Sequence, residues 1–237
     1  MLIPENLLRL SIFHAILEAV LCLESCCMAL MLADVLALSR IIPVITIDQV
    51  GQAVPLARLL LDLGFVVLEI TLRTPCALEA IKCIANTVPG AVVGAGTVIN
   101  LQQLAQVKEA GAQFAVSPGF SEQLVSEAKK QTLAYLPGIA TPSEALKAYE
   151  LGTTYLKFFP AESMGGIKTL SSIAEVLPIK FCPTGGVDQD NCINYLALPC
   201  VTCVGGTWIT PRSLIQAQAL DEIARRATEA QNLLKAL

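Results

Sequence analysis

The stretches FVVLEITL (65–72) and AVVGAGTV (91–98), joined by a helix-like segment, decide the fold of this chain. Each stretch is short, rich in β-branched residues and apolar on both faces, which is typical of a strand buried in a parallel sheet. Similar stretches recur about every 23 residues and alternate with helix-like segments, which indicates parallel βαβ units. The strands predicted in this way are 41–47, 65–72, 91–98, 113–118, 134–139, 154–160, 180–186 and 201–207.

Eight such units favour an α/β fold with a single (β/α)8 TIM barrel over residues 41–237. Helix ends support this prediction, because Gly64, Gly111 and Gly152 each follow the last apolar turn of a helix-like segment. Thr141-Pro142 has the residue types that cap and open a helix. An open doubly wound sheet agrees less well with the sequence, since no GxGxxG turn follows the first strand and no Walker A motif occurs.

Residues 1–40 do not follow the barrel pattern. They are strongly apolar, but His14 and several acidic residues interrupt them, so no uncharged run reaches the roughly 18 residues of a membrane-spanning helix. The first residues mix acidic and basic side chains, which is a poor start for a signal peptide. We expect an extra N-terminal helical segment that docks on the protein. Two other interpretations stay open: a helix on a membrane surface, or residues 1–27 outside the native product, which would then start at Met28 or Met31.

Composition and charge exclude several classes of protein. Apolar residues make up 54% of the chain and charged residues 15%, so it is not a disordered, highly charged chain. The net charge of −4 and the absence of a Lys/Arg cluster argue against a nucleic-acid partner. His14 is the only His, which rules out a His-rich metal centre. We therefore expect no metal, no nucleic acid and no membrane among the partners.

The nine Cys residues are too sparse for a disulfide framework, and their number is odd, which predicts reduced thiols in a cytoplasmic protein. Cys200 and Cys203 have the spacing of a metal or redox pair. They fall on a predicted strand, however, where residues three apart face opposite sides. We therefore expect their sulfur atoms to diverge and their role to be structural.

Two ionisable residues lie inside otherwise apolar strands: Glu69 in the second, and Lys157, the one Lys in the middle of a strand, in the sixth. A charge inside a barrel is costly unless it is paired or neutralised. One interpretation is an ion pair that only holds the barrel together. The other uses the same burial for chemistry, because an apolar wall and the nearby cation of Arg73 would favour a neutral amine, which forms Schiff bases with ketones. Glu69 would then be the proton shuttle. The wall is expected from Leu156, Phe158 and Phe159.

Two pairs of glycine residues end the last two predicted strands, in PTGG (183–186) and VGGTW (204–208). The loops after strands seven and eight form the recurrent phosphate site of barrels. Paired Gly residues let backbone N–H groups turn toward phosphate oxygens, although they also form plain tight turns. Thr207 would add a hydroxyl donor. Thr97, on the third strand, would reach a carboxylate alongside Arg73.

Seven motifs occur in order along the chain: LEITLRT (68–74), VVGAGTV (92–98), FAVSPG (114–119), LPGI with TPSE (136–144), LKFFPAE (156–162), FCPTGGV (181–187) and VGGTW (204–208). Together they resemble the 2-dehydro-3-deoxy-6-phosphogluconate (KDPG) and 4-hydroxy-2-oxoglutarate (KHG) aldolase family over roughly residues 41–237. The resemblance implies a class I aldolase of carbohydrate metabolism on a (β/α)8 barrel. It also implies a homotrimer in the cytoplasm, with small 2-oxo acid substrates and no cofactor beyond a covalent lysine–substrate imine.

The resemblance also implies a role for individual residues. Lys157 matches the Schiff-base lysine and Glu69 the acid–base glutamate. The family often has Ser where Thr207 stands, which keeps the hydroxyl, and it lacks the stretch before about Met28. The substrate contacts implied are Arg73 and Thr97 for the pyruvate carboxylate, Pro118 and Phe159 for the pocket walls, Thr184 for stereochemical choice, and Gly185, Gly186, Gly206 and Thr207 for the phosphate end.

The predicted reaction is a reversible retro-aldol cleavage that releases pyruvate and an aldehyde. The aldehyde is glyceraldehyde 3-phosphate from KDPG or glyoxylate from KHG, and the sequence leaves this choice open. It also leaves open the phosphogalactonate-derived substrate of the same family, which differs at one stereocentre. Two other functions compete: a sugar-phosphate isomerase or epimerase without a Schiff base, which would explain the Gly pairs, and a non-catalytic membrane or scaffold protein organised by residues 1–40.

Overall fold

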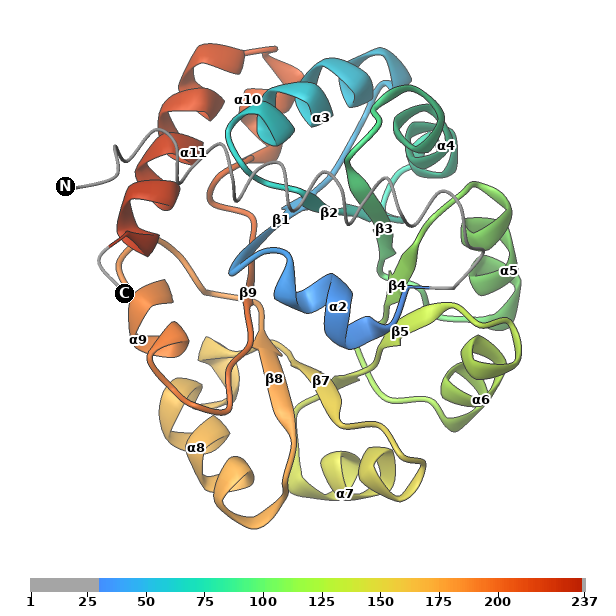
Figure 1. Cartoon of the computed structure of the whole chain (residues 1–237), viewed down its shortest axis with the longest axis vertical. Coiled ribbons are helices and arrows are strands. Elements are labelled where there is room, and N and C mark those ends of the chain that lie inside the picture. The colour runs from blue at the N-terminus through green and yellow to red at the C-terminus, as the bar shows by residue number, and fades with distance from the viewer. Residues whose placement is uncertain (1–29, 236–237) are drawn as a thin grey trace, which may run out of the picture.

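A computed structural model describes residues 30–235, in which parallel strands form a barrel ringed by helices (Figure 1). The strands lie close to the eight stretches predicted from the sequence. Their bounds are β1 (Ile41–Ile45), β2 (Val67–Thr71), β3 (Val92–Gly96), β4 (Phe114–Val116), β5 (Ala134–Leu136), β6 (Gly138–Ile139), β7 (Tyr155–Phe158), β8 (Lys180–Pro183) and β9 (Val204–Gly206).

The strands form two hydrogen-bonded sheets, in the orders β5-β4-β3-β2-β1-β9 and β6-β7-β8. Pro137 separates β5 from β6, so the predicted fifth strand is one strand broken in its middle. The carbonyl of Pro137 still accepts a hydrogen bond from the backbone N–H of Lys157 at 2.9 Å, which continues the pairing with β7 across the break. On the other side, the bridge from Thr184 to Gly205 joins β8 to β9. The predicted (β/α)8 barrel is therefore confirmed.

Helices cover the outside of the barrel, as the ring in Figure 1 shows. The predicted helix stops are confirmed, because Gly64, Gly111 and Gly152 have positive φ values of 88°, 88° and 71°. The cap is confirmed as well: Thr141 and Glu144 form a capping box. The helices are α2 (Leu32–Ala37), η1 (Val50–Gln52), α3 (Ala53–Asp62), α4 (Ala77–Thr87), α5 (Leu101–Glu109), α6 (Glu122–Lys130), α7 (Pro142–Glu150), η2 (Glu162–Met164), α8 (Gly166–Val176), α9 (Cys192–Leu196), α10 (Arg212–Gln216) and α11 (Leu220–Leu234).

Side chains along each strand alternate between the barrel interior and the layer under the helices. On β2, Val67 belongs to the interior cluster, whereas Leu68 and Ile70 belong to the larger core between barrel and helices. Every residue of β2 is buried. This explains the near-continuous apolar runs of the sequence, because a parallel strand with both faces covered leaves no position for a solvated side chain.

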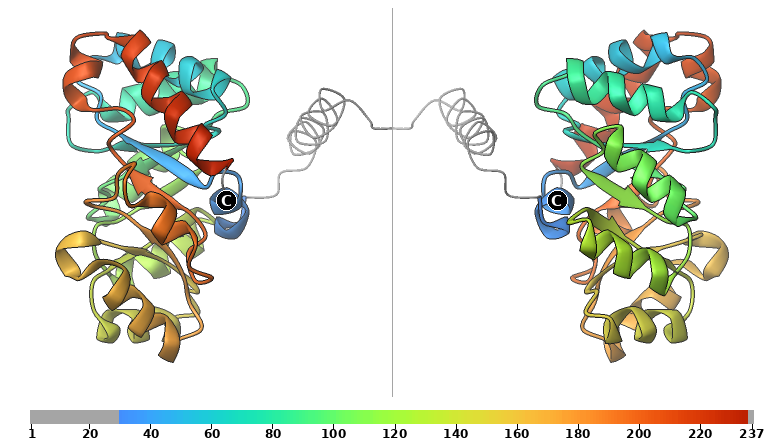
Figure 2. Two further views of the ribbon diagram at one scale, coloured as in Figure 1. Left: turned by 90° about the vertical axis from the view of Figure 1, so that its left-hand side faces the viewer. Right: turned by 90° about the vertical axis from the view of Figure 1, so that its right-hand side faces the viewer.

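The short helix α2 closes one end of the barrel, as the side views in Figure 2 show. Its residues Val35 and Leu36 are buried and pack against the interior cluster, together with the half-buried Leu30. Burying two such side chains contributes roughly 1.5–3 kcal/mol each. The predicted extension over 1–40 lies outside the described residues up to position 29, His14 included. Among residues 30–235, no helix has the length and apolar character to cross a membrane.

Candidate active site

Lys157 and Glu69 meet inside the barrel, where Lys157 Nζ lies 3.2 Å from Glu69 Oε1. The two side chains come from opposite walls, β7 and β2, and each is more than nine-tenths buried, at 7% and 6% exposure. The chain brings them together because period two turns both residues inward from strands that are apolar elsewhere. A buried pair with this geometry is stable only because each charge has its partner, and the loss of one would leave the other uncompensated.

Two glycine residues of β3 make room for this pair. A Cβ atom on Gly96 would overlap Glu69 Oε1 and lie 2.8 Å from the carboxyl carbon of Glu69. A Cβ atom on Gly94 would overlap the ring of Phe114 on β4. GAGT (94–97) therefore has a steric role that the sequence analysis missed, since the clash depends on the neighbouring strands. The signal was present as glycine at both inward positions of an otherwise branched strand.

The prediction that Leu156, Phe158 and Phe159 form an apolar wall around Lys157 is wrong for Leu156 and Phe158. Leu156 and Phe158 point outward into the core between barrel and helices, as period two requires for the neighbours of an inward Lys157. Phe159 alone contacts the amine, with Lys157 Nζ 5.5 Å from its ring centroid, a cation–π distance. The inward neighbours of Lys157 are instead polar or polarisable, since Cys182 is its partner in the β7–β8 register.

Arg73 and Thr97 follow the carboxyl ends of β2 and β3. Arg73 is exposed, and its guanidinium has no hydrogen bond or ion pair to residues 30–235. Its loop is fixed because Thr74 donates to the carbonyl of Ile47 at 2.5 Å. Thr97 is half-buried and has a φ of 64°, a left-handed conformation that is strained for a β-branched residue and is concentrated at functional sites.

Pro118 lies on the same rim, after β4, and is half-buried. A buried hydrogen-bond chain holds its loop: Tyr135 Oη donates to Ser117 Oγ at 2.7 Å, and Ser117 Oγ donates to the carbonyl of Gly119 at 2.7 Å. Burial raises the pKa of Tyr135 to about 12, so this donor stays protonated throughout the physiological range.

The two glycine pairs differ in the way they build the expected phosphate end. Gly185 and Gly186 have left-handed φ values of 95° and 80°, so they can turn their N–H groups as expected. Position 206 requires glycine for a steric reason instead, because a Cβ atom there would overlap the ring of Trp208. Thr184 is buried and Thr207 is exposed. Neither Gly205 nor Gly206 has a positive φ, so the second pair does not use the left-handed conformation of the first.

Cys182 and Cys203 are neighbouring buried thiols beside Lys157, and the sequence analysis did not find this pair. Both are fully buried in the interior cluster, whereas Cys200 packs against the outer core, so the sulfur atoms of Cys200 and Cys203 diverge as predicted. The hydrogen bond from Cys203 and the positive charge of Lys157 lower the pKa of the Cys182 thiol against its burial. The same hydrogen bond raises the pKa of Cys203.

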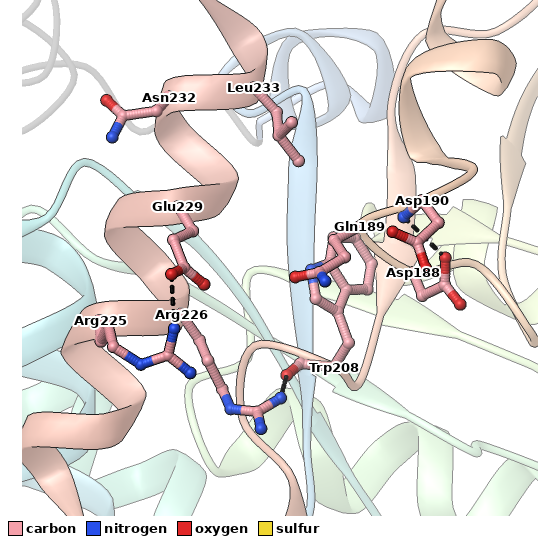
Figure 3. A pocket seen from close by; sticks show the side chains of 9 residues that line it. All are labelled: Asp188, Gln189, Asp190, Trp208, Arg225, Arg226, Glu229, Asn232 and Leu233. Carbon is pink, nitrogen blue, oxygen red and sulfur yellow. Dashed lines mark hydrogen bonds and ion pairs between the residues drawn. The ribbon is translucent and has the colours of Figure 1, made fainter.

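A groove of about 800 Å³ lies outside the barrel, between the loop after β8 and α11 (Figure 3). Its two arginine side chains already have partners, since Arg225 pairs with Glu222 and Glu229 and Arg226 donates to the carbonyl of Trp208. None of the predicted site residues lines it. Within residues 30–235, no group of three His, Cys, Asp or Glu side chains could hold a metal ion.

A closed barrel whose interior holds a buried amine beside a carboxylate is typical of a barrel enzyme that uses a lysine amine as its reactive group. Residues 32–226 match the family model "KDPG and KHG aldolase". The KHG/KDPG aldolase of Escherichia coli K12 is 48% identical over 198 residues, which cover 83% of this chain and 93% of that protein. The 2-dehydro-3-deoxy-phosphogluconate aldolase of Dickeya dadantii is 49% identical over the same shares.

A crystal structure of KDPG aldolase from Legionella pneumophila superimposes with a TM-score of 0.83 at 42% identity, covering 85% of this chain and 98% of that one. In that structure, pyruvate is captured as a covalent carbinolamine intermediate. The chain therefore belongs to the KDPG and KHG aldolase family. It is an aldolase, a lyase that acts on carbon–carbon bonds.

Proposed function

We propose that this class I aldolase cleaves KDPG to pyruvate and glyceraldehyde 3-phosphate, with KHG as a second substrate, and that Lys157 forms the Schiff base. The single observation that carries the proposal is the 3.2 Å contact between the buried amine of Lys157 and the carboxylate of Glu69. The names of the relatives, which specify KDPG or both substrates, support the choice of substrate.

The pair supplies both groups that the reaction needs. Glu69 takes a proton from Lys157, and the free amine attacks the C2 ketone of the substrate. Glu69 returns this proton to the hydroxyl of the carbinolamine, which leaves as water and gives an iminium, so that Glu69 is again a carboxylate. Glu69 then removes the proton of the C4 hydroxyl, the C3–C4 bond breaks, and its electron pair moves into the iminium to give an enamine. The aldehyde leaves, Glu69 returns a proton to C3, and hydrolysis releases pyruvate and the amine.

The rim residues orient the substrate in this proposal. Arg73 binds the carboxylate through a bidentate, charge-assisted contact, and its guanidinium, which is exposed and pairs with no group of residues 30–235, is available for it. Thr97 adds a hydroxyl beside it, and Pro118 and Phe159 form the walls. Thr184 faces the C4 centre, and the phosphate binds at the end formed by Gly185, Gly186, Gly206 and Thr207.

We further propose a cytoplasmic homotrimer that needs no cofactor other than the covalent imine. The six described cysteines are all free thiols, which supports a reducing compartment. The trimer and the absence of a cofactor rest on the family resemblance.

Borohydride trapping tests the role of Lys157. Reduction in the presence of pyruvate should leave an adduct on Lys157 that peptide mass spectrometry locates, and Lys157→Ala should lose both the adduct and the activity. Lys180→Ala is the matched control, because Lys180 lies on the neighbouring strand β8 but is exposed at the amino end of that strand, away from the site. Labelling of Lys157→Ala, or full activity of this variant, would contradict the proposal.

The preferred substrate is tested by comparing kcat/KM for pyruvate release from KDPG, from its phosphogalactonate-derived epimer and from KHG. KDPG should give the highest value. A higher value for the epimer would favour the phosphogalactonate-specific alternative while leaving the Schiff-base chemistry unchanged.

A further inference from the structure

A pair of threonine hydroxyls lies on the rim of the barrel, one step beyond Glu69. Thr46 follows β1, and its Oγ1 lies 2.9 Å from the Oγ1 of Thr71, the last residue of β2. Val44 is the register partner of Glu69, so Thr46 and Thr71 are the next inward positions on the same two strands. Thr46 is half-buried and Thr71 is 1% exposed, so Thr46 is the member that faces the mouth.

The hydrogen-bond directions leave Thr46 as an acceptor. Thr71 Oγ1 donates its only proton to the carbonyl of Ile45 at 3.0 Å. Both hydrogen bonds form at the same time only when Thr46 supplies the proton of the Thr46–Thr71 hydrogen bond. The lone pairs of Thr46 Oγ1 are then free, with no proton left to offer. Such an oxygen can accept a hydrogen bond from a substrate hydroxyl, but it has no proton to donate to a phosphate or carboxylate oxygen.

The position of β1 in the barrel indicates which part of a bound substrate lies next to Thr46. β1 pairs with β2 on one side and with β9 on the other, with Pro43 opposite Gly206. Thr46 therefore lies between Glu69, which serves C4 in the proposed function, and the phosphate end at C6. The group of KDPG between these two points is the C5 hydroxyl.

We propose that Thr46 is a specificity-determining residue that accepts a hydrogen bond from the C5 hydroxyl of the substrate, and so selects 5-hydroxylated 2-oxo acids. This inference rests on the proposed function. Thr71 is a positioning residue in it, because it fixes the direction of the Thr46 hydroxyl without touching the substrate.

The test runs the aldol reaction in the direction of synthesis, with pyruvate and one of two aldehydes. Glyceraldehyde 3-phosphate supplies the future C5 hydroxyl, and 3-phosphooxypropanal has the same chain and phosphate without it. The wild-type enzyme should prefer the hydroxylated aldehyde roughly tenfold in kcat/KM, the value of one neutral hydrogen bond. Thr46→Val, which keeps the shape, should bring this ratio close to one by lowering only the rate with glyceraldehyde 3-phosphate.

Two variants serve as controls. Thr46→Ser keeps the hydroxyl and should keep the preference. Thr228→Val removes a hydroxyl that bonds only the carbonyl of Ala224 on α11, and it should change neither rate. Equal loss with both aldehydes in Thr46→Val, an unchanged ratio, or loss of the preference in Thr46→Ser would each overturn the assignment. If the wild-type chain condenses neither aldehyde with pyruvate, the proposed function fails, and the role of Thr46 fails with it.

Discussion

The carboxylate of Glu69 lies against Gly96, in the part of the barrel interior that a side chain at position 96 would occupy. The acid–base group of the proposed mechanism therefore owes its position to a residue on the neighbouring strand that contributes no side-chain atom. This relationship and three others lead to predictions that can be measured on the purified protein.

The first prediction concerns Gly96→Ala. The added methyl group should push the carboxylate of Glu69 away from Lys157 and lower kcat about 100-fold, the lower end of the range for general acid–base catalysis. Borohydride trapping of pyruvate on Lys157 should still go to completion, although more slowly, because the amine is not displaced but loses the nearby base that takes its proton. Steady-state kinetics and trapping of the same preparation check both points.

Gly51→Ala is the matched control for Gly96→Ala, because a Cβ atom at position 51 meets no atom within 4 Å. Its kcat should equal that of the wild-type protein. A Gly96→Ala enzyme with wild-type kcat would show that the space around Glu69 is not limiting.

The second prediction concerns the stability of the buried ion pair. Lys157→Met leaves the carboxylate of Glu69 buried without its partner and should lower the free energy of unfolding by about 3–5 kcal/mol, measured by urea denaturation. The double variant Glu69→Met/Lys157→Met should recover most of this loss, because two apolar side chains of similar volume need no charge compensation. Arg225→Met, which breaks exposed pairs on α11, should cost less than about 1 kcal/mol.

A double variant as unstable as Lys157→Met alone would contradict the second prediction. The instability would then arise from repacking rather than from an uncompensated charge.

The third prediction concerns acid stability. Hydrogen bonds from Arg212 lower the pKa of Asp48 from 3.8 to about 2 in the folded protein, with help from Gln216. A depressed carboxylate pKa stabilises the fold above the unfolded value and loses this effect as the pH falls through the folded value. The difference in unfolding free energy between wild type and Arg212→Ala should therefore be constant above about pH 5, shrink below it and vanish only below about pH 2.

Urea denaturation at a series of pH values measures this difference. Arg58→Ala is the control, since Arg58 donates to the carbonyl of Thr87 rather than to an acid, and its effect should not vary over the same range. An Arg212→Ala difference that stays constant down to pH 2 would exclude the linkage to Asp48.

The fourth prediction uses Trp208, the only Trp of the chain, whose ring packs on Gly206 at the proposed phosphate end. Titration with glycerol 3-phosphate should change the intrinsic fluorescence, and glycerol should not. Gly186→Ala should abolish the response, because its φ is 80° and a Cβ atom would lie 2.6 Å from that of Glu162. Trapping of pyruvate should be retained in this variant. A response to glycerol, or an unchanged response in Gly186→Ala, would place the phosphate elsewhere.

The sequence predicts the barrel well because its signals are local. Apolar runs, Gly helix stops and the Thr141 cap each depend on a few neighbouring residues, and the structure confirms them. Lys157 and Glu69 could be found for a related reason, since a charge inside a buried strand is conspicuous and period two gives its direction. The same rule, applied to Leu156 and Phe158, would have placed them outside the barrel from the start.

Contacts between strands could not be predicted in the same way. The steric role of Gly96, the thiol pair of Cys182 and Cys203 and the hydroxyl pair of Thr46 and Thr71 depend on register across the barrel. Register is set by the closed packing of all strands and not by any one of them. The break at Pro137 belongs here too, because the pairing of Lys157 with its carbonyl continues the barrel where strand geometry stops.

The closure by α2 has a practical consequence for handling the enzyme. Leu30 packs at the closed end of the barrel, and Gln231 near the end of α11 lies against Gly64, in the loop that precedes β2 at the same end. Both ends of the described chain therefore leave the molecule on the side away from Lys157. Attachment to a solid support through either end would point the open mouth toward the solution, so an immobilised enzyme should retain access to its substrates.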